Sequence, residues 1–169
     1  MDIMEAYLEN SDFNIQHLPA NEADTIFDLW VELHKELDSS ISFKVSGPST
    51  KKWSDNKTRY MSREQQGNFV IIVATDKSKM SVGYCICWVS GHAKIGEIVS
   101  LYILPAYRSK GLGSIIMNNA NDWFDSNSAR VIRVTVDGGN DRAYKLYQHF
   151  GFMPEYIVMR NKKSKSVRL

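Results

Sequence analysis

A strand-like run that passes through a glycine-rich turn into a helix-like run limits what this chain can fold into more than any other feature. The apolar run covers residues 98–104, and the turn reads Arg-Ser-Lys-Gly-Leu-Gly-Ser over 108–114. Apolar residues then keep helical spacing from 112 to 124, and residues 130–136 alternate as a second strand. A strand, a long helix and a strand make a βαβ unit with a right-handed crossover. The sequence therefore predicts an α/β fold with a parallel strand pair within residues 95–136.

The glycine turn is suited to binding phosphate. The first N–H groups of a helix have no intrahelical partner and point out of the helix start, where they attract anions. Gly111 and Gly113 lack the Cβ atoms that would keep a pyrophosphate away from the backbone, and Arg108 and Lys110 add positive charge. We interpret residues 108–114 as a pyrophosphate cradle at the carboxyl end of a strand, where ligands of open α/β sheets collect.

Two better-known glycine loops do not fit this turn. A P-loop requires a lysine directly after its second glycine, whereas here the lysine precedes Gly111, and Gly113 is followed directly by Ser114. The dinucleotide-binding fingerprint requires a third glycine at the position where Ile116 stands. The cradle therefore belongs to neither class.

The pattern Arg-x-x-Gly-x-Gly, preceded by Leu-Tyr-Ile-Leu-Pro over residues 101–105, resembles the acyl-CoA-binding motif of the GCN5-related N-acetyltransferase (GNAT) family. A second stretch, Asn-Asp-Arg-Ala-Tyr-Lys-Leu-Tyr-Gln-His-Phe-Gly-Phe over residues 140–152, is similar to the second motif of that family. The two motifs stand in the family's order, and the resemblance covers most of residues 13–160.

The resemblance implies a mixed central sheet of about six to seven strands with a splayed parallel pair, flanked by about four helices. The residues themselves agree with a strand over 13–18 and with a hairpin formed by 68–75 and 81–89. An amphipathic helix fits residues 23–37, and a second short helix fits about 49–61. The expected architecture is thus a mixed sheet covered by helices.

Length and composition favour one domain over residues 1–169, with flexible termini at 1–12 and 161–169. The hydrophobic content of 43% is enough for a sizeable core. No run approaches the roughly 20 consecutive apolar residues that cross a bilayer. Residues 1–10 carry acids where a signal peptide has a basic and then apolar start. We therefore expect a cytoplasmic protein with no membrane partner.

Charge and cysteine usage argue against two further classes of function. The net charge is +2, and five basic residues without an acid lie in residues 160–169, so the rest of the chain has no basic excess. We interpret this tail as a solvated terminus rather than a contact for nucleic acid or the ribosome, and we expect no nucleic-acid partner. Cys85 and Cys87 lack the spacing of a zinc site, so we expect small packing residues and no metal.

The resemblance implies an N-acetyltransferase that transfers the acetyl group of acetyl-CoA to a primary amine by direct attack in a ternary complex. The acceptor would be a small-molecule or peptide amine, and a homodimer is a further expectation because dimers are common among such enzymes. The alternative is a non-catalytic module that binds or senses acyl-CoA. The family's motifs place the coenzyme on Leu101, Tyr102, Ile103, Arg108, Ser109, Lys110, Gly111, Leu112, Gly113, Ser114 and Asn140.

The attacking amine must first lose a proton, because an alkyl ammonium with a pKa near 10.4 is almost fully protonated at neutral pH. Glu97 is the candidate base, since it falls in phase with Ile95, Val99, Leu101 and Ile103 on an apolar strand face unless a bulge intervenes. Several family members carry a glutamate base at a similar place. The alternative is an exposed Glu97 at the start of the strand with no catalytic part.

Tyr147 is the candidate general acid, because it matches the family's tyrosine on the helix of the second motif. A phenol with a pKa near 10 can protonate a departing thiolate whose thiol has a pKa near 8.5. Since Ala143, Leu146 and Phe150 share its helical spacing, a core tyrosine is the alternative. Asn140 is expected to cap this helix, and in the family it also holds the pantetheine arm.

The resemblance also assigns a role to the strand backbone. In the family this strand splays from its parallel neighbour, which frees N–H groups of residues 101–103 to hold the thioester carbonyl oxygen. A β-bulge within residues 99–103 is the device that we expect to free them, and the pantetheine arm would pair with the same strand.

Acceptor choice lies, for this family, in the first helix pair and the late strands, which here means about residues 32–61 and 153–160. The identity of the acceptor does not follow from these residues. The lone histidines His34, His92 and His149 receive no chemical role. Side chains that could line an acceptor cleft are Trp30, His34, Glu36, Asp38, Trp53 and Tyr156.

Overall fold

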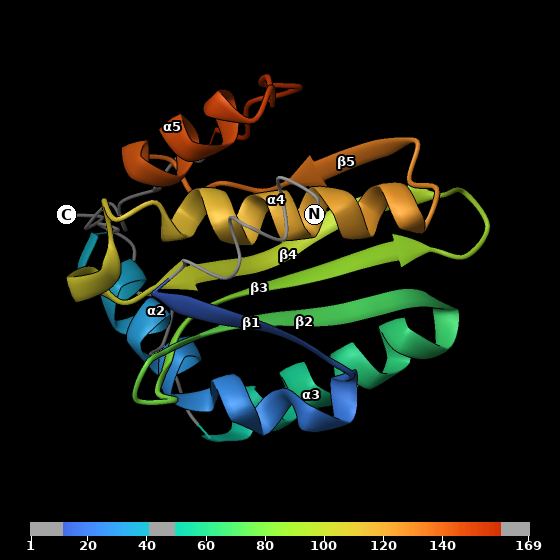
Figure 1. Ribbon diagram of the computed structural model, residues 1–169. Coiled ribbons are helices and arrows are strands. Elements are labelled where there is room, and N and C mark those ends of the chain that lie inside the picture. Colours follow the sequence, from blue (N-terminus) through green and yellow to red (C-terminus); the bar gives the residue numbers. More distant parts are fainter. Residues whose placement is uncertain (1–11, 41–49, 160–169) are drawn as a thin grey trace, which may run out of the picture.

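The computed structural model describes residues 12–40 and 50–159, and its centre is a sheet with the strand order β1-β2-β3-β4-β5 (Figure 1). The strands are β1 (Phe13–Leu18), β2 (Gly67–Asp76), β3 (Ser81–Ser90), β4 (Ile95–Ile103) and β5 (Val131–Val134). Neighbours from β1 to β4 are antiparallel, whereas β4 and β5 run parallel. The expected α/β class, mixed sheet and parallel pair are therefore confirmed.

Helices cover both faces of this sheet. The helical elements are η1 (Ala20–Ile26), α2 (Phe27–Ser40), α3 (Thr50–Gln66), η2 (Pro105–Tyr107), α4 (Leu112–Ser126) and α5 (Asp141–His149). The elements η1, α2 and α3 pack on one face, and α4 packs on the other (Figure 1). The second helix continues to Gln66, beyond the expected end near residue 61, and leads directly into β2.

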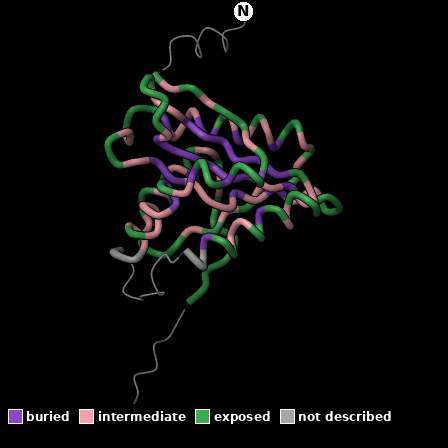
Figure 2. Tube along the Cα trace, turned by 90° about the horizontal axis from the view of Figure 1, so that it is seen from below, coloured by how far each residue is buried: buried purple, intermediate pink, exposed green. Residues whose placement is uncertain are grey.

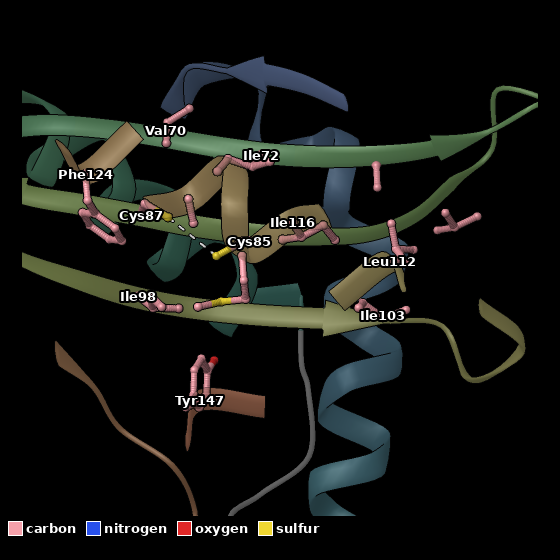
Figure 3. Packing of buried hydrophobic residues seen from close by; sticks show 14 of the residues in the cluster. Val70, Ile72, Cys85, Cys87, Ile98, Ile103, Leu112, Ile116, Phe124 and Tyr147 are labelled. Carbon is pink, nitrogen blue, oxygen red and sulfur yellow. Dashed lines mark hydrogen bonds between the residues drawn. The ribbon is translucent and has the colours of Figure 1, made fainter. Parts of the chain in front are cut away.

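Two apolar cores result, because side chains of the central strands alternate between the faces. Cys85 and Cys87 of β3 project into the core under α4, whereas Tyr84 and Ile86 project into the core under α2 and α3. The sheet is the most deeply buried part of the chain (Figure 2). The two cysteines are free thiols 3.6 Å apart at their sulfur atoms, and they pack as small core residues (Figure 3). Their expected packing role is confirmed.

The parallel pair is short and opens at the middle of β4. The register joins Ile95 to Val131 and ends where Ile98 faces Val134. On the other side, β3 pairs Ile86 with Ser100 and Cys87 with Ile98, which leaves Val99 as the extra residue of a bulge. This bulge lies within the range where we expected one. Past it, β4 keeps β3 as its neighbour and has no partner toward β5 in the described parts of the chain.

The late strands are not confirmed, because the described residues form five strands rather than six to seven. Residues 153–159 follow α5 as an exposed segment without assigned strand structure (Figure 2). Within residues 12–40 and 50–159, no helix is long and apolar enough to cross a membrane. The large exposed side chains of the C-terminal segment are Met153, Tyr156, Ile157, Val158 and Met159.

Candidate active site

A cavity of about 280 Å³ lies where β4 separates from β5. Its floor is β4 on both sides of the bulge, from Ile98 to Leu101, and one wall is the stretch from Val134 to Asp137 that follows β5. Helix α5 contributes Asn140, Ala143 and Tyr147, and helices α2 and α3 contribute the remaining lining. The lining residues from α2 and α3 are Trp30, Leu33, His34, Leu37, Asn56, Arg59 and Tyr60.

The cavity exists because the bulge at Val99 and the end of pairing at Val134 coincide. In a strand, alternate residues direct their N–H and C=O groups to opposite edges, and backbone groups that lose a strand partner must find another. Residues 101–103 therefore keep one edge paired with β3 and one edge without a strand partner, and Leu101 lines the cavity. This is the splayed geometry that the family resemblance implies.

The start of α4 forms an open set of backbone donors. Gly111 precedes the helix with φ of 81°, a left-handed conformation that glycine adopts without a steric cost. Its carbonyl oxygen accepts hydrogen bonds from the N–H groups of Ser114 and Ile115 at 3.0 and 3.1 Å. Among the described residues, none provides an acceptor for the N–H groups of Leu112 and Gly113. These two donors face outward at the positive end of the helix dipole.

The two glycines of the turn have different surroundings. A Cβ atom on Gly111 would meet no atom within 4 Å, so this residue borders open space. A Cβ atom on Gly113 would instead lie 3.4 Å from Leu146 and 3.6 Å from Ile103, which are ordinary contacts inside the fold. Gly113 therefore faces α5 and β4, and the space there would accommodate a Cβ atom.

Arg108 is already occupied by groups of the protein. Its Nη2 donates to both carboxylate oxygens of Glu36 at 2.7 and 2.9 Å, and its Nε donates to the carbonyl oxygen of Ile103 at 2.7 Å. The guanidinium also lies over the ring of Tyr102. The sequence interpretation gave this positive charge to a pyrophosphate, whereas the structure pairs it with a carboxylate of α2. Lys110 is exposed, with its ammonium 5.4 Å from the ring centre of Tyr107, and remains the cation beside the turn.

Tyr102 also directs its side chain away from the coenzyme edge of β4. Its hydroxyl donates to Oε1 of Glu36 at 2.9 Å, and its ring packs in the core under α2 and α3. Burial and this carboxylate raise the pKa of Tyr102 to about 12. Only its backbone is placed to meet a ligand at the open edge.

Tyr147 and Asn140 reach the cavity from α5. The side chain of Asn140 accepts a hydrogen bond from the N–H of Ala143 at 3.1 Å, so its expected capping role is confirmed. Tyr147 is 7% exposed and stacks against Phe152, with its phenol directed toward β4 (Figure 3). Burial raises the pKa of Tyr147 well above its ordinary value, so the phenol keeps its proton. It is both a core residue and a cavity residue.

Glu97 shares a face of β4 with Val99, as expected, but lies on the opposite face from Leu101 and Ile103. Leu101 and Ile103 pack in the core under α4, whereas Glu97 points toward α3 and binds Arg63. The expected common phase with Leu101 and Ile103 is wrong because the bulge at Val99 shifts the alternation by one residue. Nη2 of Arg63 lies 3.2 and 3.1 Å from the two carboxylate oxygens. Glu97 is not part of the cavity lining.

The expected acceptor residues divide into several groups. Trp30 and His34 line the cavity, whereas Glu36 is bound to Arg108. Trp53 is buried and donates from Nε1 to Asp24, which identifies it as a packing residue. Tyr156 is exposed beyond α5 and does not line the cavity. The side chain of Asp38 lies outside the described residues.

Two charged residues that line the cavity were not predicted from the sequence. Asp137 follows the carboxyl end of β5, next to the glycine pair 138–139, and Arg59 lies on α3 one residue before the buried Tyr60. The position of Asp137 at a strand's carboxyl end was a readable signal. The sequence holds no comparable signal for Arg59, because its position at the cavity depends on how α3 packs. In the described ranges no group of three His, Cys, Asp or Glu residues is placed to hold a metal ion.

Residues 25–152 match the sequence profile of the Acetyltransferase (GNAT) family. The chain belongs to the GNAT acetyltransferase family. This membership confirms the resemblance drawn from the two motifs, together with the expected class of acyl-CoA-dependent acetyltransferases. The matched range holds the open edge of β4, the glycine turn and α5, which are the parts that surround the cavity.

Curated relatives of this GNAT chain agree with the assignment. An uncharacterised N-acetyltransferase of Methanocaldococcus jannaschii is 22% identical over 160 residues, covering 92% of this chain and 67% of that protein. An uncharacterised N-acetyltransferase of Archaeoglobus fulgidus is 27% identical over 136 residues, covering 79% of this chain and 88% of that protein. A mycothiol acetyltransferase of Renibacterium salmoninarum is 36% identical over 63 residues, covering 37% of this chain and 19% of that protein.

Solved structures share the fold of this GNAT chain at low sequence identity. A tetramutant of the BH1408 protein of Bacillus halodurans has a TM-score of 0.71 and 16% identity, covering 89% of this chain and 99% of that chain. AAC(6')-Iy, an aminoglycoside N-acetyltransferase solved with a bisubstrate analogue of CoA and acetylneamine, has a TM-score of 0.64 and 15% identity, covering 91% and 99%. An aminoglycoside acetyltransferase from a soil metagenomic sample, in complex with sisomicin, has a TM-score of 0.61 and 17% identity, covering 90% and 96%.

Proposed function

We propose that this protein transfers the acetyl group of acetyl-CoA to a primary amine by direct attack in a ternary complex, in the cavity between β4 and β5. One observation carries the proposal: the unpaired edge of β4 at Leu101 and the phenol of Tyr147 border the same cavity. A donor edge and a proton source on one cavity are what the reacting thioester needs at its oxygen and at its sulfur.

The residues around the opening fit an extended coenzyme. The N–H groups of Leu112 and Gly113 and the ammonium of Lys110 suit the pyrophosphate, because helix starts and cations both attract this anion. The exposed turn residue Ser109, the left-handed Gly111 and the helix residue Ser114 complete this cradle in the proposal. The amides of the pantetheine arm would pair with the backbone of residues 101–103, and Asn140 borders the same route.

The proposed chemistry assigns one task to each group at the open edge. A backbone N–H of β4 would donate to the carbonyl oxygen as it gains negative charge, which acts as an oxyanion hole. Tyr147 would donate its proton to the sulfur as the thiolate leaves. Because burial raises the pKa of this phenol, the proton is present throughout the physiological pH range. No covalent intermediate on the protein is needed when the amine is held beside the thioester.

Among the proposed catalytic residues, Glu97 has the least structural support. It was the base expected from the family, but Arg63 holds both of its oxygens and it does not line the cavity. Glu97 would act as the base only if Arg63 moved away from its carboxylate to another partner. A carboxylate inside the cavity lining is available at Asp137, which suits a cationic acceptor.

The acceptor is proposed to be the amine of a small molecule or a peptide. Two similar folds belong to aminoglycoside acetyltransferases, which supports small polyamine-like acceptors as the first class to test. We place the protein in the cytoplasm, and the two free thiols in its core agree with a reducing compartment.

A homodimer is part of the proposal as well. The exposed apolar segment 153–159 supports it, because contiguous apolar side chains on a surface mark association sites. The molar mass in solution, measured by light scattering, tests this part separately from the activity.

Release of CoA thiol tests the function. Purified protein and acetyl-CoA are mixed with sisomicin, spermidine, single amino acids or short peptides, and free thiol is followed over time. At least one amine should accelerate thiol release and appear as its acetylated product by mass spectrometry. Binding of acetyl-CoA without transfer to any of these amines would instead favour the non-catalytic binding module.

A further inference from the structure

His34 occupies a defined position on the wall of the cavity. It lies on α2, where its ring stacks on Trp30 with 3.9 Å between ring centroids and an interplanar angle of 39°. Its Nδ1 lies 2.8 Å from the carbonyl oxygen of Trp30, one helical turn earlier. Both side chains line the cavity that also holds Leu101 and Tyr147. The ring is therefore held in one orientation by a hydrogen bond and by stacking.

The hydrogen bond fixes which nitrogen carries the proton. A carbonyl oxygen can only accept, so Nδ1 of His34 must be the donor in this contact. In the neutral ring the other nitrogen, Nε2, then carries a lone pair. In the part of the chain that the structure describes, nothing forms a hydrogen bond with Nε2. A histidine with its donor nitrogen engaged and its acceptor nitrogen available is arranged as a proton acceptor.

We propose that His34, through Nε2, is the catalytic base that removes a proton from the ammonium of the acceptor. This inference rests on the proposed acetyl transfer and adds to it the group that Glu97 was expected to supply. The preference for His34 over Glu97 follows from geometry, because His34 lines the cavity, whereas Arg63 holds Glu97 outside the lining.

The protons balance in this scheme. The acceptor enters as an ammonium, and Nε2 of His34 takes one proton to give a neutral amine and an imidazolium. The amine nitrogen then bonds to the thioester carbon, and the carbon–sulfur bond breaks with its electron pair on sulfur. The nitrogen loses its second proton to solvent as the amide forms, and Tyr147 supplies the proton that sulfur gains. Solvent then returns a proton to the phenolate of Tyr147 and takes the proton from the imidazolium of His34. The net products are the acetylated amine, CoA thiol and one released proton.

Other titratable groups around the cavity come from each neighbouring element. Arg59 and Tyr60 face it from α3, Asp137 faces it after β5, and Tyr147 faces it from α5. On α2 itself, the flanking Glu36 is bound to Arg108 and the flanking Lys35 pairs with Glu32. Among the cavity residues within the described ranges, His34 is the only imidazole.

The kinetic test uses variants that separate the base from the hydrogen bond. In His34→Asn the amide nitrogen replaces Nδ1 and can still donate to the Trp30 carbonyl, but no basic nitrogen replaces Nε2. The matched control is His92→Asn in the exposed turn between β3 and β4. With the fastest amine from the thiol-release panel, His34→Asn should lower kcat/KM at pH 7 by on the order of 100-fold or more. The loss should shrink as pH rises toward the pKa of the amine, since the acceptor then deprotonates without help.

Three readouts keep this inference separate from the proposed function. Affinity for CoA, measured by calorimetry, should be the same in His34→Asn, His92→Asn and the unmodified protein. Added imidazole should restore part of the lost rate in His34→Asn. Nitrogen-15 NMR of the histidine rings, assigned through the His34→Asn spectrum, should show the Nδ1–H tautomer for His34 at neutral pH.

Each contrary result overturns the assignment of the base. An Nε2–H tautomer at His34 would do so whether or not an acceptor has been found. Transfer by the unmodified protein with an undiminished rate in His34→Asn would remove His34 from the mechanism while leaving the acetyl transfer intact. A uniform rate loss at every pH without imidazole rescue would reduce His34 to a structural residue.

Discussion

Nη2 of Arg108 bridges both carboxylate oxygens of Glu36, at 2.7 and 2.9 Å. The contact joins α2 to the turn that precedes α4, across 72 positions of sequence. The Arg108 side chain is 18% exposed, and its Nε also donates to the carbonyl oxygen of Ile103 at the end of β4. One arginine thus connects α2, the end of β4 and the glycine turn.

Removal of Glu36 should destabilise the protein. We expect Glu36→Ala to lower the free energy of unfolding by about 1–2 kcal/mol, because a partly buried arginine and the Tyr102 hydroxyl both lose an acceptor. Thermal unfolding measures the change. The control is Glu32→Ala on the same helix, whose pair with Lys35 is exposed and should contribute little. Equal shifts in the two variants would show that the bridge from α2 is an ordinary surface contact.

Substitution of the two glycines should separate backbone strain from packing. Gly111→Ala puts a side chain on a backbone with φ of 81°, so we expect a loss of about 1–2 kcal/mol and weaker CoA binding as the turn relaxes. Gly113→Ala adds only ordinary contacts with Leu146 and Ile103, and should bind CoA nearly as well as the unmodified protein. Calorimetric titration with CoA measures both. The reverse order of affinities would mean that Gly113 is the residue that the pyrophosphate approaches.

Loss of the Tyr147 hydroxyl should affect turnover and not binding. Tyr147→Phe keeps the ring that packs against Phe152, so CoA affinity should stay within about two-fold, while kcat falls on the order of 100-fold. The control is Tyr144→Phe on the exposed side of the same helix. Steady-state thiol release with each variant makes the comparison. An unchanged kcat in Tyr147→Phe would leave the residue as a core tyrosine only.

Buried phenols should make the protein sensitive to alkali. Burial raises the pKa of Tyr60 to about 12 and also raises the pKa values of Tyr84 and Tyr147. In the unfolded chain these phenols lose their protons near pH 10, whereas the folded chain retains them. The unfolded state then binds fewer protons, so stability should fall as pH rises from about 10 toward 12. Urea unfolding at stepped pH measures this slope, which should be shallower in Tyr60→Phe.

The fold was predictable where short patterns carry the information. The strand, glycine turn and helix of residues 98–124 formed as expected, because alternation, helical spacing and a left-handed glycine are local properties. The cap at Asn140 is equally local. The bulge was expected somewhere in residues 99–103, and the structure places it at Val99.

The features that the sequence did not predict depend on partners that are distant in the sequence. A one-residue bulge moves every preceding side chain to the other face, so Glu97 could not be assigned to a face before the bulge was located. Arg108 could not be matched to Glu36, and Arg59 could not be placed in the cavity, because both depend on how α2 and α3 pack. The expected late strands stay a prediction, because spacing alone does not reveal pairing partners and the described residues form five strands.

A structure of the protein with CoA bound tests the central claim most directly. We predict that the pantetheine arm lies along residues 101–103, with the sulfur within hydrogen-bond distance of the Tyr147 hydroxyl and the pyrophosphate on the N–H groups of Leu112 and Gly113. Coenzyme that binds outside the cavity between β4 and β5, or a sulfur directed away from Tyr147, would contradict the account.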